Sequence, residues 1–143
     1  MKLHTASETV SFIKELEEQS AQFYEDVAQR YPESQDALLA YGRENKQYFT
    51  QIQRAYYSVI TDAIEGGYAF DLEADEHTLD TELPEEASYS DALDKAVEIE
   101  EKMIRFYTVA AEQSMSLMAD VPRNFKIVAR KRQKRIQQLK LLK

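Results

Sequence analysis

Residues 17–24 read EEQSAQFY and residues 100–107 read EEKMIRFY, so the chain carries two copies of the pattern E-E-x-x-x-x-F-Y. Apolar residues recur at helical spacing around each copy, which predicts that both copies lie on helices with one buried face. The first glutamate of each copy, Glu17 or Glu100, falls on or beside the apolar stripe. A buried carboxylate destabilises a fold unless something pairs with it. The repeat therefore indicates a shared, paired site at the centre of a helical bundle.

Four helices are expected from the apolar spacing and from residues that cap or break helices. These markers are Thr5 or Ser7, Tyr31-Pro32, Ser34 or Asp36, Gly66-Gly67, Ser88 or Ser90, and Pro122. The expected helices lie near residues 7–30, 35–65, 90–118 and 123–142. Their predicted buried positions are Ile13, Leu16, Ser20, Phe23 and Val27; Leu38, Tyr41, Tyr48, Ile52, Tyr56 and Val59; Leu93, Ala96, Val97, Met103, Ile104, Tyr107 and Ala110; and Phe125, Val128, Ile136, Leu139 and Leu142.

The composition agrees with one all-helical domain spanning residues 1–143. Three glycines and three prolines leave little from which to build hairpins or phosphate-binding loops. The absence of cysteine excludes disulfide scaffolds, zinc ribbons and thiol catalysis. No apolar run is long enough to span a membrane, and the start, MKLHTASETV, indicates a helix start and not a signal peptide. We therefore expect a cytoplasmic protein without a membrane partner.

The charge distribution is uneven. The formal net charge is −8, so nucleic-acid binding by the whole surface is unfavourable. Residues 62–94 contain twelve acidic residues and no lysine or arginine, and include the expected connection over residues 66–88. Within it, His77 with Asp75, Glu76 and Asp80 could bind a surface cation, although an ordinary acidic loop is the simpler interpretation.

The last helix has the opposite charge. Residues 123–143 contain nine lysines or arginines and no acidic residue. Three interpretations are open: a solvated face that balances the acidic connection, a surface for nucleic acid or another acidic partner, or an internal role for some of the cations.

These features resemble the rubrerythrin-type branch of the ferritin-like superfamily. The resemblance rests on the repeated E-x-x-x-x-x-F-Y, on the long link between the second and third helices, and on Phe125-Lys126-Ile127-Val128-Ala129, which matches the family's F-x-x-[LV]-A lead-in to a metal-binding E-x-x-H. It implies an antiparallel ferritin-like four-helix bundle with a long crossover after the second helix. It also implies a two-metal centre built from one glutamate on each of two helices and Glu-x-x-His on each of the other two.

Carried over to this chain, the resemblance implies Glu17 and Glu100 as the single-glutamate ligands. On the second helix it implies Glu44, with Gln47 where histidine is expected; an alternative register would instead point to Arg43 and Lys46. On the last helix the Glu and His positions hold Arg132 and Arg135.

The last helix departs from the family in any register, because no Asp, Glu or His follows Asp120. The two histidines, His4 and His77, belong to no E-x-x-H. A guanidinium is always charged and cannot ligate a cation. We therefore expect that the dinuclear site is lost and that Arg132 supplies the metal's positive charge by pairing with Glu17, Glu44 or Glu100.

Other roles for these residues stay open. Glu17 and Glu100 are expected to be paired core carboxylates, with ligation of a single residual metal or surface placement as alternatives. Tyr24 and Tyr107 are expected to be core aromatics, and a redox role would require a metal. The methionines are expected to fill the core: Met103, Met115 and Met118.

The functional expectation is a structural or protein-interaction module whose partner is an unidentified protein or a second copy of the chain. The alternative is a metal-binding oxidoreductase or iron-handling protein with a reduced carboxylate site. No cofactor is expected, although iron or another divalent metal at low occupancy stays open. Nothing in the sequence names a substrate.

Overall fold

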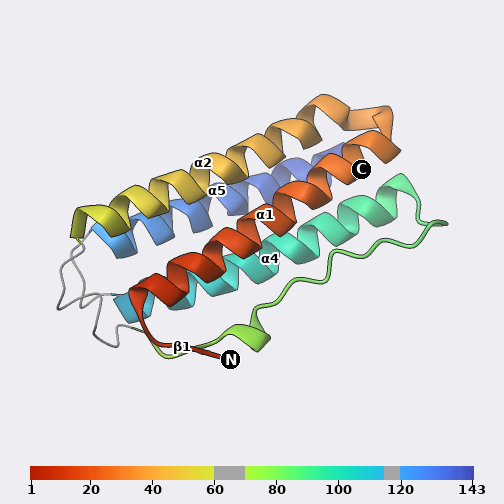
Figure 1. Cartoon of the computed structure of the whole chain (residues 1–143). Coiled ribbons are helices and arrows are strands. Elements are labelled where there is room, and N and C mark those ends of the chain that lie inside the picture. Colours follow the sequence, from red (N-terminus) through yellow and green to blue (C-terminus); the bar gives the residue numbers. More distant parts are fainter. Residues whose placement is uncertain (60–69, 115–119) are drawn as a thin grey trace.

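A computed structural model describes residues 1–59, 70–114 and 120–143, and in this part of the chain the fold is all-helical apart from two short strands. The four long helices are α1 (Ala6–Arg30), α2 (Gln35–Val59), α4 (Tyr89–Gln113) and α5 (Asp120–Leu142). Helix α1 packs mainly on α2, and α4 on α5; α2 also lies beside α5, and α1 beside α4 (Figure 1). The predicted all-α class and the four helices are confirmed.

The helix ends follow local capping chemistry. Thr5 and Glu8 form a reciprocal capping box at the start of α1, and Ser88 and Asp91 do the same for α4. Helix α5 begins at Asp120, three residues before the predicted start, because Pro122 is tolerated in a first turn, where its missing N–H has no helical partner. The predicted ends of the second helix at Gly66-Gly67 and of the third near 118 lie outside the described residues.

The segment before α4 is fixed by a small sheet that the sequence analysis did not predict. Strand β1 (Lys2–Leu3) pairs antiparallel with β2 (Leu72–Glu73), and the short helical turn Ala74–Glu76 follows. Leu3 and Leu72 are both buried, which explains why the first residues extend to a strand before the helix begins. A second short turn, Pro32–Ser34, joins α1 to α2.

The core runs between all four helices. The predicted stripe positions are buried, except that Val97, Ile104 and Leu142 are only partly covered, and the side chain of Val59 lies outside the described residues. Met103 is buried as expected, whereas Met115 and Met118 are not among the described residues. Among the described residues, no helix has the length and apolar character needed to cross a membrane.

Candidate functional site: a buried charge cluster

Five polar side chains meet at the centre of the bundle: Glu17 of α1, Asn45 of α2, Glu100 of α4, and Arg132 and Arg135 of α5. We call them the central cluster. None exposes more than 2% of its surface. Every long helix contributes at least one member.

Their positions follow from helical periodicity. On α2 the buried residues Tyr41, Asn45, Tyr48 and Ile52 succeed one another at steps of three or four, which keeps Asn45 on the same face as its apolar neighbours. On α5, Arg132 follows the buried Val128 by one turn, and Arg135 lies beside the buried Ile136. The core face of each helix therefore carries its own polar groups into the interior.

Arg132 joins the two carboxylates. Its Nη1 donates to Oε2 of Glu100 at 2.7 Å, and its Nη2 donates to Oε1 of Glu17. A guanidinium is planar and carries N–H donors on both Nη1 and Nη2, so one arginine can donate hydrogen bonds to two carboxylates at once. Arg132 thereby links α5 to both α1 and α4.

Arg135 occupies the neighbouring position. Its Nη1 donates to Oε1 of Glu100 at 3.0 Å and to Oδ1 of Asn45 at 2.6 Å. Its Nη2 donates to the backbone carbonyl of Tyr41 and to the hydroxyl of Tyr48, both at 3.3 Å. Arg135 therefore binds α5 to α2 as well as to α4.

The repeated tyrosines bond crosswise to the repeated glutamates. Tyr24, from the first copy of the repeat, donates to Oε1 of Glu100 in the second copy at 2.6 Å. Tyr107, from the second copy, donates to Oε2 of Glu17 in the first at 3.1 Å. Both tyrosines are fully buried, as expected of core aromatics. The sequence repeat thus corresponds to a repeated hydrogen bond in the structure.

Aromatic rings enclose both guanidinium groups. The guanidinium carbon of Arg132 lies 5.3 Å from the ring centre of Tyr48 and 5.9 Å from that of Tyr107. That of Arg135 lies 4.9 Å from the ring centre of Tyr41. Such contacts stabilise a desolvated cation. The Nε–H groups of both arginines, however, are buried without a hydrogen-bond partner in the described part of the chain.

The two carboxyl groups have different proton affinities. Burial raises the pKa of Glu17 to about 7, although Arg132 opposes the shift. Burial acts on Glu100 in the same direction, but the charges of Arg132 and Arg135 outweigh it and hold the pKa of Glu100 below its usual range. The difference follows from the contacts, because Glu100 accepts from two guanidinium groups and Glu17 from one. Burial, together with the neighbouring carboxylates, places the pKa of Tyr24 and Tyr107 well above the ordinary phenol value.

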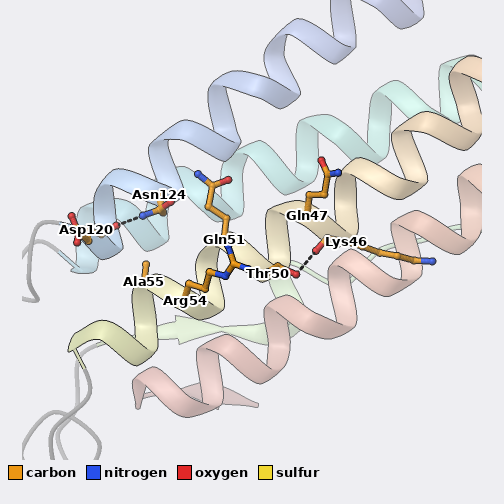
Figure 2. Close-up of a pocket in the computed structure, with 8 residues that line it drawn as sticks. All are labelled: Lys46, Gln47, Thr50, Gln51, Arg54, Ala55, Asp120 and Asn124. Carbon is orange, nitrogen blue, oxygen red and sulfur yellow. Dashed lines mark hydrogen bonds between the residues drawn. The ribbon is translucent and has the colours of Figure 1, made fainter.

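The residues implied for the second helix lie elsewhere. The side chain of Glu44 is 44% exposed and reaches Arg135 only from the rim of the cluster, at 3.6 Å. Gln47 is exposed and lines an open cavity between α2 and α5 (Figure 2). Arg43 and Lys46, the residues of the alternative register, are exposed as well. The structure thus brings together Glu17, Glu100, Arg132, Arg135, Tyr24 and Tyr107, but not Gln47.

Asn45 is the member that the sequence analysis missed. Its signal was present, because it falls midway between Tyr41 and Tyr48 on the buried stripe. Asn45 also donates from Nδ2 to Oγ of Ser20 at 2.8 Å, so both ends of its amide are used.

The central cluster does not fit the dinuclear centre that the family resemblance implies. Its two carboxylates already accept hydrogen bonds from guanidinium and phenol groups, and α5 presents cations where ligands would be needed. In residues 1–59, 70–114 and 120–143 no three Asp, Glu, His or Cys side chains are grouped to hold a metal ion. This includes the surface site considered for His77, whose ring packs on Phe106 instead, with ring centres 5.2 Å apart.

No protein-family model, curated protein or solved structure matches the chain.

Proposed function

We propose that this protein is a ferritin-like bundle of the rubrerythrin type in which two arginines have replaced a dinuclear metal centre. On this proposal the chain is a structural or protein-interaction module of the cytoplasm and not an oxidoreductase. The observation that carries the proposal is the placement of Arg132, which is fully buried and bonded to both Glu17 and Glu100.

The crosswise tyrosine pairs support a common origin for the two halves. Tyr24 with Glu100 and Tyr107 with Glu17 form two equivalent contacts around one centre, as expected if both halves once ligated the same pair of ions. In such a site the metals neutralise several carboxylates. Here two guanidinium groups supply the positive charge within the same four helices.

The chemistry of the cluster supports a structural role. Arginine stays protonated in proteins. Burial acts to lower the pKa of Arg132, but the charges of Glu100 and Glu17 outweigh it and raise that pKa above its ordinary value. Removing one partner of such a buried pair leaves an uncompensated charge, which is strongly destabilising. The cluster therefore favours one arrangement of the four helices and offers no open position to a substrate.

The alternative of a single residual metal bound by Glu17, Glu44 and Glu100 has less support. Glu44 reaches only the rim, and the other two carboxylates are held by Arg132. Low occupancy by iron or another divalent metal would need these bonds to break.

Metal analysis of the purified protein tests the proposal. Protein expressed with excess iron, and separately with manganese or zinc, should contain far less than one metal ion per chain by plasma mass spectrometry. Its melting temperature should not change when a chelator is added. Stoichiometric metal, or a fall in melting temperature with the chelator, would overturn the proposal in favour of the oxidoreductase or iron-handling alternative.

A further inference from the structure

The two layers of the bundle carry opposite charge. Residues 35–59 and 120–143, which contain α2 and α5, have 12 basic and 3 acidic side chains, a formal charge of +9. Residues 1–34 and 70–114, which contain α1, α4 and the connection, have 21 acidic and 6 basic side chains, a formal charge of −15. The central cluster accounts for only two charges of each sign, so the remaining imbalance lies mainly outside it.

The positive charge is concentrated on one face. On α5, Arg123, Lys126, Arg130 and Lys134 are exposed at steps of three and four residues, on the side opposite the buried Val128. Helix α2 and the flank of α5 add further exposed cations. We call the whole set the basic face: Arg43, Lys46, Arg54, Arg123, Lys126, Arg130, Lys131 and Lys134. The nine cations of residues 123–143 do not all face outward, because Arg132 and Arg135 are buried.

Most of the basic face is free to meet an outside partner. Lys46 lies 3.6 Å from Glu25, and Arg123 pairs with Asp120 at 3.3 Å. Lys126, Arg130 and Lys134 form no ion pair with any described residue.

An open cavity of about 740 Å³ lies within the basic face, between α2 and α5 (Figure 2). Cations and amides line most of it: Lys46, Gln47, Gln51, Arg54 and Asn124. Its one acidic side chain, Asp120, is already paired with Arg123. Donors of this kind suit carboxylate side chains.

The matching negative surface belongs to the connection. Residues 71–86 contain eight acidic side chains and no basic one. Figure 1 shows this segment running along α4, with α2 and α5 on the other side of the bundle. It is held in place by Asp80, which bonds to Lys95 at 3.0 Å, and by His77, which packs on Phe106. We call residues 71–86 the acidic face.

We propose that the basic face of one copy of the chain docks on the acidic face of a second copy. This docking proposal rests on the proposed interaction role and identifies a second copy of the chain as the partner. The cations of the basic face span about 17 Å on each helix, from Arg123 to Lys134 on α5 and from Arg43 to Arg54 on α2. Because the two faces differ, the contact is heterologous and can continue beyond a dimer. A nucleic acid would also meet the basic face, but the net charge of −8 repels a polyphosphate at longer range.

Light scattering after size exclusion, at several protein concentrations, tests the docking. In about 20 mM salt the average mass should rise with concentration above 16.6 kDa, and in about 500 mM salt it should return to that value, because screening weakens exposed charge pairs. A mass of one chain at both salt concentrations would overturn the proposal.

Charge reversal identifies the surfaces. The basic-face variant Arg130→Glu/Lys134→Glu and the acidic-face variant Glu85→Lys/Glu86→Lys should each be monomeric alone and should associate when mixed. The control Lys14→Glu/Lys140→Glu changes the net charge as much as the basic-face variant, but at exposed positions outside both faces, and should self-associate like the wild type. Circular dichroism checks that all variants are folded.

The alternatives give other results. Self-association that survives both reversals would contradict docking through these faces. Binding of a labelled single-stranded RNA by monomeric wild type, lost in Arg130→Glu/Lys134→Glu, would replace the second copy by a nucleic acid. A metal-free monomer would overturn only this docking, whereas stoichiometric metal would overturn the proposed function.

Discussion

At the scale of single residues, Arg132 determines whether the interior is neutral. Two carboxylates face it: Glu17 has the uncharged hydroxyl of Tyr107 as its other donor, and Glu100 has that of Tyr24 together with the guanidinium of Arg135. Sequence reasoning identified this arginine because it stands where the family resemblance implies a glutamate ligand, on the apolar stripe between Val128 and Ile136. The bond partners on α1 and α4 followed from the repeat.

Replacing Arg132 should therefore destabilise the fold severely. Arg132→Ala removes the cation that pairs with Glu17 and one of the two cations that pair with Glu100. The variant should lower the free energy of unfolding by about 3–5 kcal/mol. Lys140→Ala, at an exposed position of the same helix, should change it by less than about 0.5 kcal/mol. Urea denaturation measures both. Equal midpoints for the two variants would show that Arg132 is not a structural cation.

Glu17 gives stability a pH dependence of defined sign. The folded chain has a Glu17 pKa of about 7, against 4.5 for the ordinary value, so between these values the folded state binds a proton that the unfolded state lacks. The contribution of Glu17 to the free energy of unfolding therefore falls as pH rises from about 4.5 to 7, and is constant above that.

Glu17→Gln removes this titration. Relative to the variant, the wild type should lose up to about 1.4 kcal/mol of stability per pH unit across the window. Urea denaturation of both proteins between about pH 4.5 and pH 8 measures the difference. The shifted titration of His77 is common to both and cancels. A difference that does not vary with pH would contradict the raised pKa of Glu17.

At the scale of elements, each helix was predictable from its apolar period, but the register of α2 was not. The family pattern pointed to Glu44 as the glutamate and to Gln47, three residues on, at the histidine position. The structure instead buries the neutral Asn45. One residue along a helix turns the side chain by about 100°, so a shift of one separates the rim from the centre. The pairing of β1 with β2 could not be predicted from the sequence either, because strands of two residues are too short to show an alternating apolar pattern.

Asn45 should accordingly matter more than Gln47. Asn45→Ala removes an acceptor of Arg135 and the donor to Ser20, and should cost about 1–3 kcal/mol of stability because a buried donor, Nη1 of Arg135, and a buried acceptor, Oγ of Ser20, each lose a partner. Gln47→Ala, two residues on but exposed, is the matched control and should be nearly neutral. Thermal unfolding of the two variants decides between these registers; a larger loss for Gln47→Ala would favour the register of the family pattern.

At the scale of the whole molecule, the fold separates charge twice. Inside, two arginines and two glutamates balance within one cluster. Outside it, the layer of α2 and α5 keeps a formal charge of +7 and the opposite layer a formal charge of −13, once the cluster's own charges are left out. The sequence showed both charge runs, and the family resemblance pointed to Arg132 and Arg135 as inward-facing cations, but neither showed how the remaining cations are divided among the faces of the bundle. That division depends on how four helices pack, which only tertiary structure decides.

We propose that guanidinium groups stand where a rubrerythrin-type centre would hold its metals. The most direct test of this proposal is the metal content of the wild type and of the variant Arg132→Glu/Arg135→His, measured side by side. The variant places a Glu-x-x-His pattern on α5. Both proteins are folded or refolded with excess iron or zinc, and circular dichroism monitors their helicity. We expect almost no metal in the wild type and about one ion per chain in the variant, held by Glu17, Glu100 and the two new side chains. Stoichiometric metal in the wild type, or a folded variant that binds none, would contradict the proposal.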